Sequence, residues 1–407
     1  MVVPEYNANK EISVNKWQEI EKKYYMPTFK RMPLTIVKGQ GCRVWDENGK
    51  EYLDFVAGWA VNNLGHCHPA VVQAVTGQLK TLIHTSNSYY TIPQLELAEI
   101  LVENSCLDRV FFCNSGAEAT EGAVKLARRY GHLHLGGAYE VITTTGSFHG
   151  RTLAMVSASG QSKFQKPYIP LPSGFINVEY NSVEAIEKAM NDITCAVMLE
   201  PVQGEGGVNL PADGYLQAVR ALCDRKGILF ILDEIQTGIG RSGSLFAYQQ
   251  YGIEPDIMTL AKGLASGMPI GAILAKEAAS VFAAGEHGST FGGSPVACAA
   301  GYTTLKFIIE NNVCQNANLM GQYLKKGLEE LKQKHTCIAE VRGMGLLLAM
   351  EFNQDIAQSL TMACLENGLL VNKLKDNALR FMPPLIINKD DIDEALAILD
   401  KVLGTKR

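Results

Sequence analysis

The chain has 407 residues, of which 47% are hydrophobic and 19% are charged, and its formal net charge is −5. Acidic and basic residues are intermixed, which argues against a nucleic-acid-binding protein and against a polybasic membrane surface. No apolar run approaches the roughly 20 residues needed to cross a bilayer, and the N-terminus lacks a signal-peptide pattern.

The first 68 residues combine a helix with a compact β pattern. Residues 1–35 mix polar and aromatic side chains, and we expect them to begin with a helix. Ile36-Val37 and Cys42-Arg-Val-Trp45 alternate around a glycine-containing bend, as in paired strands. Asp46-Glu-Asn-Gly49 predicts a hairpin turn, which leads into a further strand at Tyr52-Leu-Asp-Phe55.

Short apolar segments alternate with helical periodicity from about residue 69 onwards. Strands are predicted at 110–113, 140–144, 196–199, 229–232 and 257–260, and helices at 69–83, 93–104 and 116–130. Strands that alternate with helices favour an α/β fold with a mostly parallel central sheet.

The C-terminal part is expected to start with one long helix over about 302–333. Strands at 338–341, 346–350 and 379–382, a helix at 355–367 and a final helix opened by Asp390 complete it. A chain of this length is expected to form about two domains. We predict a large domain over 69–305 and a small α/β domain built from residues 1–68 and 306–407.

The cysteines and histidines do not form a recognisable metal site. The ten cysteines are scattered without a C-x-x-C pair, which predicts reduced thiols and a cytoplasmic protein. His66-Cys67-His68 are adjacent in a loop, where side chains rarely converge on one ion, so we expect no metal there.

Lys262 has the most unusual surroundings of any ionisable residue. It lies in a loop of small residues and glycines that directly follows an apolar strand. Burial lowers the pKa of a lysine, and a neutral amine can form a Schiff base. Asp233 ends the most apolar strand of the chain, where an α/β enzyme places its chemistry, although a helix N-cap is the alternative. Together the two residues indicate pyridoxal 5′-phosphate (PLP), because the acid can pair with the pyridinium nitrogen.

Two segments could hold the phosphate of such a cofactor. Gly116 and Ala117 lie at the predicted start of a helix, whose free N–H groups and dipole attract an anion. Ser289 and Thr290 lie in a glycine-rich run that offers hydroxyl groups to a second side of the phosphate. A capped helix and an ordinary glycine-rich turn are the alternatives.

Three residues could contact the cofactor ring or a substrate. Phe148 could stack on the ring, and Gln236 could donate a hydrogen bond to its phenolic oxygen. Arg151 could bind a carboxylate through two parallel hydrogen bonds. The alternatives are core packing for Phe148 and a structural ion pair for Arg151.

Two acids and one arginine lie next to other predicted strands. Glu200 and Glu205 follow the strand at 196–199 in a glycine-rich segment, and each could instead be a solvated loop acid. Arg380 lies in the strand at 379–382 and could instead be a surface arginine.

The order of the motifs is informative. They are Ser115-Gly-Ala-Glu-Ala, Phe148-His-Gly-Arg-Thr, Glu200-Pro-Val-Gln-Gly-Glu, Asp233-Glu-Ile-Gln-Thr-Gly, Ala261-Lys-Gly, Gly288-Ser-Thr-Phe-Gly-Gly and Leu379-Arg-Phe-Met-Pro-Pro. From about residue 25 to 404 the chain resembles the class III PLP-dependent aminotransferases of fold type I. Tyr52-Leu-Asp-Phe-Val-Ala-Gly, Leu64-Gly-His-Cys-His-Pro and His84-Thr-Ser-Asn are similar to the acetylornithine group within that class.

The resemblance implies a role for each cofactor-binding residue. Lys262 would carry the cofactor and then act as acid and base, while Asp233 would bind the pyridine nitrogen. Phe148 and Gln236 would contact the ring, as described above. The phosphate would be held by Gly116 and Ala117, and by Thr290 of the partner subunit in a homodimer with shared sites.

The resemblance also implies how two unlike substrates are accepted in turn. Arg151, with Ser289 nearby, would bind a substrate carboxylate. Arg380 would bind the α-carboxylate of glutamate or 2-oxoglutarate, and Glu205 would mask Arg380 in the other half-reaction. Phe29 replaces a tyrosine that contacts the free α-amine of ornithine in ornithine aminotransferases, and therefore suits an acylated nitrogen.

The expected reaction transfers the terminal amino group of N2-acetyl-L-ornithine to 2-oxoglutarate, as in arginine biosynthesis. Trp59 stands where a small aliphatic residue is usual in the acetylornithine group, so it either narrows the pocket or only repacks its wall. Succinyl-diaminopimelate, ornithine or 4-aminobutyrate are alternative donors. A PLP aminomutase is a further alternative, but it would need no Glu205–Arg380 switch.

Overall fold

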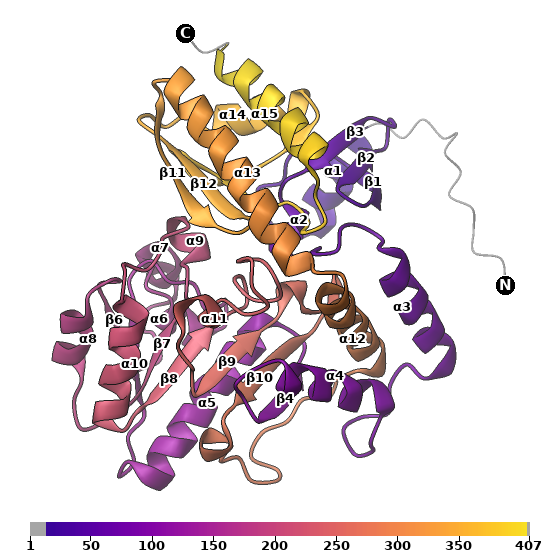
Figure 1. The fold of residues 1–407 in the computed structure, drawn as a ribbon. Coiled ribbons are helices and arrows are strands. Elements are labelled where there is room, and N and C mark those ends of the chain that lie inside the picture. Colours follow the sequence, from indigo (N-terminus) through magenta and orange to yellow (C-terminus); the bar gives the residue numbers. More distant parts are fainter. Residues whose placement is uncertain (1–13, 405–407) are drawn as a thin grey trace.

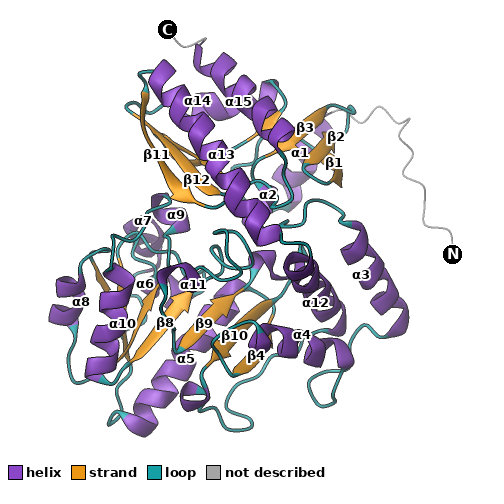
Figure 2. Cartoon of the chain, in the orientation of Figure 1, coloured by secondary structure: helices purple, strands orange, loops and turns teal. Residues whose placement is uncertain are grey.

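The structure is a computed structural model that describes residues 14–404. A seven-stranded sheet with flanking helices occupies one end of the molecule, and two four-stranded sheets lie at the other end (Figure 1). Figure 2 shows that helices lie on both faces of the large sheet. This layering confirms the predicted α/β class.

The large sheet contains the strands that the sequence predicted between residues 110 and 260. In spatial order they are β4 (Arg109–Cys113), β10 (Gly271–Ala275), β9 (Ile257–Leu260), β8 (Leu229–Asp233), β7 (Thr194–Leu199), β5 (Glu140–Thr144) and β6 (Phe175–Val178). Every residue of β7, β8, β9 and β10 is buried, which explains why these strands read as unbroken apolar runs. Strand β10 runs antiparallel to both of its neighbours, β4 and β9, and all other pairings in the sheet are parallel, so the sheet is mixed but mostly parallel.

Most of the helices between residues 57 and 310 surround the large sheet (Figure 1). Their bounds are α2 (Ala57–Ala60), α3 (Pro69–Thr81), α4 (Ile92–Glu103), α5 (Gly116–His134), α6 (Leu153–Ala158), α7 (Ser162–Gln165), α8 (Val183–Ala189), α9 (Gly204–Gly207), α10 (Tyr215–Lys226), α11 (Tyr248–Tyr251) and α12 (Pro295–Glu310). Three 3₁₀ turns are η1 (Lys166–Tyr168), η2 (Lys262–Ala265) and η3 (Glu277–Ala279). Helix α5 packs across β9 and β10, and α12 packs on α3 and α4.

The two smaller sheets join the two ends of the chain. One contains β1 (Ile36–Gln40), β2 (Arg43–Asp46), β3 (Glu51–Asp54) and β13 (Leu369–Leu370), and the other contains β11 (Ile338–Met344), β12 (Leu347–Phe352), β15 (Ala378–Phe381) and β14 (Asn372–Lys375). Strand β13 pairs with β3 in parallel, across more than 300 residues of sequence. Four helices belong to this end: α1 (Val14–Tyr24), α13 (Val313–Lys334), α14 (Ala357–Glu366) and α15 (Lys389–Gly404).

The structure corrects one predicted element and adds others. The single helix predicted over 302–333 is wrong, because α12 ends at Glu310 and α13 begins at Val313. Asn312 adopts a left-handed φ of 52°, which ends the helical path, and asparagine tolerates this conformation better than most residues. Strands β6 and β10 were not predicted. The predicted domain limits stay a prediction, which the pairing of β3 with β13 supports. Within residues 14–404, no helix is both long and apolar enough to span a membrane.

Candidate active site

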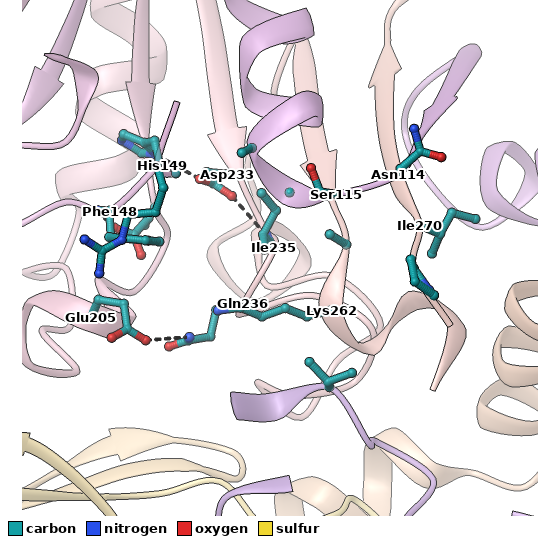
Figure 3. A pocket seen from close by; sticks show the side chains of 18 of the residues that line it. Asn114, Ser115, Phe148, His149, Glu205, Asp233, Ile235, Gln236, Lys262 and Ile270 are labelled. Carbon is teal, nitrogen blue, oxygen red and sulfur yellow. Dashed lines mark hydrogen bonds and ion pairs between the residues drawn. The ribbon is translucent and has the colours of Figure 1, made fainter. Parts of the chain in front are cut away.

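A cavity of about 380 Å³ lies at the carboxyl edge of the large sheet. Eight of the predicted site residues line it: Gly116, Ala117, Phe148, Arg151, Glu205, Asp233, Gln236 and Lys262. Figure 3 shows Phe148, Asp233 and Lys262 arranged around this space. They come from the segments after β5, at the end of β8 and after β9, and parallel strands bring these segments to one edge of the sheet.

Asp233 is held by three hydrogen bonds at the end of β8. Its Oδ1 accepts from the Ile235 backbone N–H and from the Thr259 hydroxyl, both at 3.1 Å. Its Oδ2 lies 2.8 Å from Nδ1 of His149. The His149 ring is fully buried, and its Nε2 has no hydrogen-bond partner among the described residues. Asp233 therefore has a fixed orientation and is not the N-cap of a helix.

Lys262 begins the η2 turn directly after β9. Its φ of 40° is left-handed, a conformation that non-glycine residues rarely adopt and that often marks functional sites. Burial lowers the pKa of Lys262, although the nearby carboxylate of Glu205 partly opposes this effect. A Cβ on Gly263 would lie 2.1 Å from Nδ2 of Asn63, so any larger residue there would have to displace that side chain. The amine is thus held in the cavity with a larger neutral fraction than an exposed lysine has.

The N-terminus of α5 provides a place for an anion. Ser115 caps the helix by accepting from the Glu118 backbone N–H at 3.2 Å, and Gly116 and Ala117 follow as the first helical residues. The first N–H groups of a helix have no acceptor within the helix, so they are available to a ligand. A Cβ on Gly116 would lie 3.0 Å from the Ile235 side chain, so little space remains for a larger residue.

Ser289 and Thr290 do not line the cavity in one chain. The Ser289 hydroxyl accepts from Nδ2 of Asn114 at 3.0 Å, and Asn114 does line the cavity. Thr290 is exposed on the surface. The described part of a single chain therefore does not bring Thr290 to its own cavity.

Glu205 and Arg380 form an ion pair in which the arginine is buried and the acid side chain is 31% exposed. Oε1 of Glu205 and Nη1 of Arg380 are 2.7 Å apart, and Arg380 is only 1% exposed, so the alternative of a surface arginine is wrong. The same Nη1 donates to Oε1 of Gln236 at 3.1 Å, and Nε donates to Asn372 at 3.1 Å. Burial alone would raise the pKa of Glu205, but Arg380 and then Lys262 lower it to about 2. Glu205 is therefore ionised at neutral pH.

Arg151 and Phe148 belong to an aromatic cluster at the cavity. The Arg151 guanidinium lies 4.0 Å from the centre of the Phe164 ring and 5.4 Å from that of Phe148. The two rings meet edge to face at 5.6 Å. No described residue forms an ion pair with Arg151, so the structural ion pair that was its alternative is absent from the described part of the chain. Cation–π contact positions the guanidinium and leaves its N–H groups available.

Phe29 and Trp59 lie together but outside the cavity lining. Their ring centres are 6.5 Å apart, and each side chain is about half exposed. Trp59 lies in the α2 turn, in which all four residues from Ala57 to Ala60 have left-handed φ values. Such a turn costs free energy at each non-glycine residue, so the packing around it must hold Trp59 in place.

The comparisons with known proteins agree with this geometry. A family model described as Aminotransferase class-III matches residues 24–403.

The chain belongs to the class III aminotransferases.

Two curated members of this family are similar over nearly their whole length. The acetylornithine aminotransferase of Caldanaerobacter subterraneus is 53% identical over 388 residues, which cover 95% of this chain and 99% of that protein. The acetylornithine aminotransferase of Methanocaldococcus jannaschii is 49% identical and covers 96% of this chain and 98% of its own.

A solved class III structure has the same fold. The ornithine aminotransferase of Toxoplasma gondii, crystallised with oxidised glutathione, superposes with a TM-score of 0.93 at 34% identity. The match covers 97% of this chain and 94% of the Toxoplasma chain. PLP occupies the active site of that protein at partial occupancy. This class III chain is thus an aminotransferase with the fold type I architecture that its motif order predicted.

Sequence reasoning missed several residues that shape this class III site. His149 lies inside the Phe148-His-Gly-Arg motif, yet only its neighbours were assigned roles. Thr259 hydrogen-bonds Asp233, and Glu200 lines the cavity although it could have been a solvated loop acid. The available signal was sequence position alone: His149 lies inside a motif, Glu200 directly follows a predicted strand, and Thr259 lies in the strand that precedes Lys262. His66 and His68 have structural contacts instead: His66 lies 2.7 Å from Asp54, and His68 packs on Phe307.

Proposed function

We propose that the chain uses PLP to transfer the terminal amino group of N2-acetyl-L-ornithine to 2-oxoglutarate, which yields N-acetyl-L-glutamate 5-semialdehyde and L-glutamate. The observation that carries this proposal is the ion pair between Glu205 and the buried Arg380, beside Lys262. An arginine that can be covered or uncovered suits an enzyme whose two substrates differ by one carboxylate. The names of the curated relatives at 53% and 49% identity support the same reaction.

The residues of the cavity fit PLP. A phosphate would meet the N–H groups of Gly116 and Ala117 at the α5 N-terminus, and a pyridinium nitrogen would meet the oriented carboxylate of Asp233. Nε2 of the buried His149 ring has no hydrogen-bond partner among the described residues, so a polar atom beside Asp233 is left unsatisfied. Phe148 would lie against the ring, and Gln236 near its phenolic oxygen. When bound, PLP acts as an electron sink that makes the proton on the amine-bearing carbon acidic.

Lys262 would move that proton. Because burial lowers its pKa, the amine spends more time neutral and can accept a proton from carbon, then return it as the conjugate acid. Asp233 keeps its position through three hydrogen bonds and supplies the negative charge that the electron sink needs.

Glu205 and Arg380 would alternate between two arrangements. With an acylated donor, Glu205 covers Arg380 as in the present structure, so no positive charge is left without a partner. With 2-oxoglutarate, the substrate carboxylate replaces Glu205 on Arg380. Arg151, held by two aromatic rings and without an ion-pair partner in the described chain, would take the other carboxylate, with Ser289 nearby.

The acyl group of the donor would contact Phe29 and Trp59, which lie outside the cavity lining. Phe29 and Trp59 form an apolar pair that offers no acceptor to a free α-amine. This favours an acylated nitrogen over the charged amine of ornithine, since a cation next to an apolar wall loses hydration without compensation.

We also propose a homodimer in which Thr290 of the partner subunit completes the phosphate site. Thr290 is exposed, and so are large apolar side chains of the 83–92 and 289–292 segments, which contact each other through Asn87 and His84; this supports an interface there. The apolar side chains are Ile83, Tyr89, Tyr90, Ile92 and Phe291. A cytoplasmic location belongs to the same proposal, and the ten free thiols agree with a reducing compartment.

The test is a single-turnover panel of amine donors followed by the visible spectrum of the bound cofactor. N2-acetyl-L-ornithine is expected to convert the cofactor with the highest kcat/KM, ahead of succinyl-diaminopimelate, ornithine and 4-aminobutyrate. A higher value for another donor would replace the proposed substrate. A cofactor spectrum that returns unchanged without 2-oxoglutarate, while the amino group moves to another carbon of the same substrate molecule, would indicate an aminomutase instead.

A further inference from the structure

Glu200 is a buried acid that the proposed chemistry does not use. It directly follows β7, its side chain lines the cavity, and the residue is only 5% exposed. Burial raises the pKa of Glu200 to about 7; nearby His149 lowers it and Asp233 raises it further. A carboxylate in this position costs stability unless it makes specific contacts, so its contacts indicate why an acid stands here.

Each oxygen of Glu200 accepts from a different loop. Oε1 accepts from the Phe148 backbone N–H at 2.8 Å, and Oε2 accepts from the Gly204 backbone N–H at 3.1 Å. Phe148 belongs to the segment after β5 that carries Arg151, whereas Gly204 opens the α9 turn that carries Glu205. The Glu200 carboxyl group therefore joins the segment that contains Phe148 to the α9 turn that contains Glu205.

The far end of the α9 turn is held as well. Nε and Nη2 of Arg342, in β11, donate to the Gly207 carbonyl oxygen at 3.0 and 2.8 Å. The turn is thus fixed by Glu200 at its first residue and by Arg342 at its last. Glu205 lies between these two points, so its reach toward Arg380 depends on both.

Only a carboxylate can make both contacts of Glu200. The two backbone N–H groups approach different oxygens of Glu200, whereas only one of the two terminal atoms of an amide side chain can accept, because the other is an NH2 group. Replacing Glu200 with glutamine therefore keeps the size of the side chain but leaves one buried N–H facing another donor.

We propose that Glu200 is a positioning residue that sets the spacing between the Phe148 segment and the Glu205 turn, and thereby biases which half-reaction the site favours. The inference rests on the proposed function for its second part, because the half-reactions are those of that function. Its first part, that Glu200 joins two loops, does not depend on which reaction the protein catalyses.

The chain offers a matched control in Glu234. This acid is also fully buried, burial raises its pKa to about 7, and it accepts from two backbone N–H groups, Ala247 at 2.6 Å and Tyr248 at 2.8 Å. Glu234 does not line the cavity. Glu200→Gln and Glu234→Gln thus make the same chemical change in two different places.

The first measurement is hydrogen exchange in the cofactor-free protein. Peptides that contain Phe148 or Gly204 should exchange at least about ten-fold faster in Glu200→Gln than in wild type, since an unmatched buried N–H loses its protection. The same peptides should be unchanged in Glu234→Gln. Unchanged exchange at both sites in Glu200→Gln would overturn the joining of the loops, whether or not the enzyme has the proposed activity.

The second measurement compares the two half-reactions in the holoenzyme. In Glu200→Gln the turn is released, Arg380 is uncovered more often, and kcat/KM for the amine donor should fall at least about ten-fold relative to that for 2-oxoglutarate. Glu234→Gln should keep the wild-type ratio. If Glu200→Gln lowers kcat/KM equally in both half-reactions, Glu200 does not bias the site between them. The same conclusion follows if Glu234→Gln changes the ratio of the two kcat/KM values as much as Glu200→Gln does.

A further variant covers the case in which Glu200→Gln does not fold. Glu200→Asp keeps the charge but is shorter by one methylene, so it cannot reach both N–H groups, and the same two measurements apply. If no donor reacts with wild type, the proposed function fails, and the exchange data still decide whether Glu200 joins the loops.

Discussion

Oε1 of Glu205 lies 2.7 Å from Nη1 of Arg380, and the Arg380 side chain is almost completely buried. Nη1 also donates to Gln236, so the acid does not satisfy the guanidinium alone. The pair combines a strong local attraction with an acid whose side chain is 31% exposed, on the short glycine-flanked turn α9. Because the turn is held at Gly204 and Gly207, the group that would move is the Glu205 side chain. An arrangement of this kind can open for a competing carboxylate without leaving the arginine unpaired.

Removing the Arg380 side chain should lower kcat/KM more in the 2-oxoglutarate half-reaction than in the donor half-reaction. In Arg380→Ala, kcat/KM for 2-oxoglutarate should fall by about one to two orders of magnitude, because a hydrogen bond to a charged group contributes about 1.5–3 kcal/mol. The donor half-reaction should lose less. Arg220→Ala is a suitable control, because Arg220 pairs with Asp224 and Asp256 away from this cavity. Equal losses in both half-reactions of Arg380→Ala would contradict the switch.

The same pair should make stability depend on pH in acid. Arg380 lowers the pKa of Glu205 to about 2 in the folded protein, against 4.5 for the unperturbed group. A lowered carboxyl pKa contributes stability that is complete above the unfolded value and is lost as the pH falls toward 2. The difference in unfolding free energy between wild type and Glu205→Gln, at most about 3 kcal/mol from this shift, should therefore shrink between pH 5 and pH 2. Urea unfolding at several pH values measures it, and a difference that does not change with pH would disprove this linkage.

Lys262 should be required for covalent attachment of the cofactor. Lys262→Ala is expected to bind PLP only reversibly, to show no borohydride fixation of cofactor to the chain, and to lose at least about three orders of magnitude in kcat. Intact-mass measurement after borohydride treatment gives the result directly. Lys276→Ala is the control, since Lys276 pairs with Glu254 on the outside of the sheet. A fixed cofactor on another residue of Lys262→Ala would show that the assignment is wrong.

Phe29 should influence the choice between acylated and free amine donors. Phe29→Tyr adds a hydroxyl that can accept from a charged α-amine, so the ratio of kcat/KM for ornithine to that for N2-acetyl-L-ornithine should rise by about ten-fold. Steady-state kinetics with both donors measures the ratio. Phe175→Tyr makes the same chemical change at a partly exposed phenylalanine of β6 that does not line the cavity, and it should leave the ratio as it is. No change in Phe29→Tyr would mean that Phe29 does not face the donor.

Gly204 should tolerate no side chain without a functional loss. A Cβ at this position would lie 1.7 Å from Oε1 of Gln236, so Gly204→Ala must displace the end of that side chain and break its bond to Arg380. Because Gln236 can rotate, we expect a stability loss of only about 1–3 kcal/mol together with weaker binding of 2-oxoglutarate. Gly77→Ala, in α3 with open space around it, should retain wild-type binding. Wild-type KM for 2-oxoglutarate in Gly204→Ala would contradict this expectation.

The sequence predicted the parts of this site that depend on local pattern. Buried parallel strands produce apolar runs, so the positions of Asp233 and Lys262 at strand ends could be read directly. The start of α5 could be read from Ser115 and Gly116 in the same way.

Contacts between distant segments could not be predicted from local pattern. His149 and Asp233 are 84 residues apart, and nothing near either residue shows that the two side chains meet. Glu200 has the local features of a solvated loop acid, and only the fold places it between two backbone N–H groups. The break between α12 and α13 was missed because Asn311-Asn312 interrupts an otherwise continuous helical period by only two residues.

The position of Arg380 in β15 has a consequence for how the protein is made. A ribosome completes β10, the last segment of the large sheet in sequence, roughly a hundred residues before it adds Arg380. The nascent chain therefore holds Lys262, Asp233 and the α5 N-terminus while Glu205 still lacks its arginine. The residues proposed to hold the cofactor are thus synthesised well before the arginine proposed to bind the co-substrate, and a chain that ends before β15 has the former without Arg380.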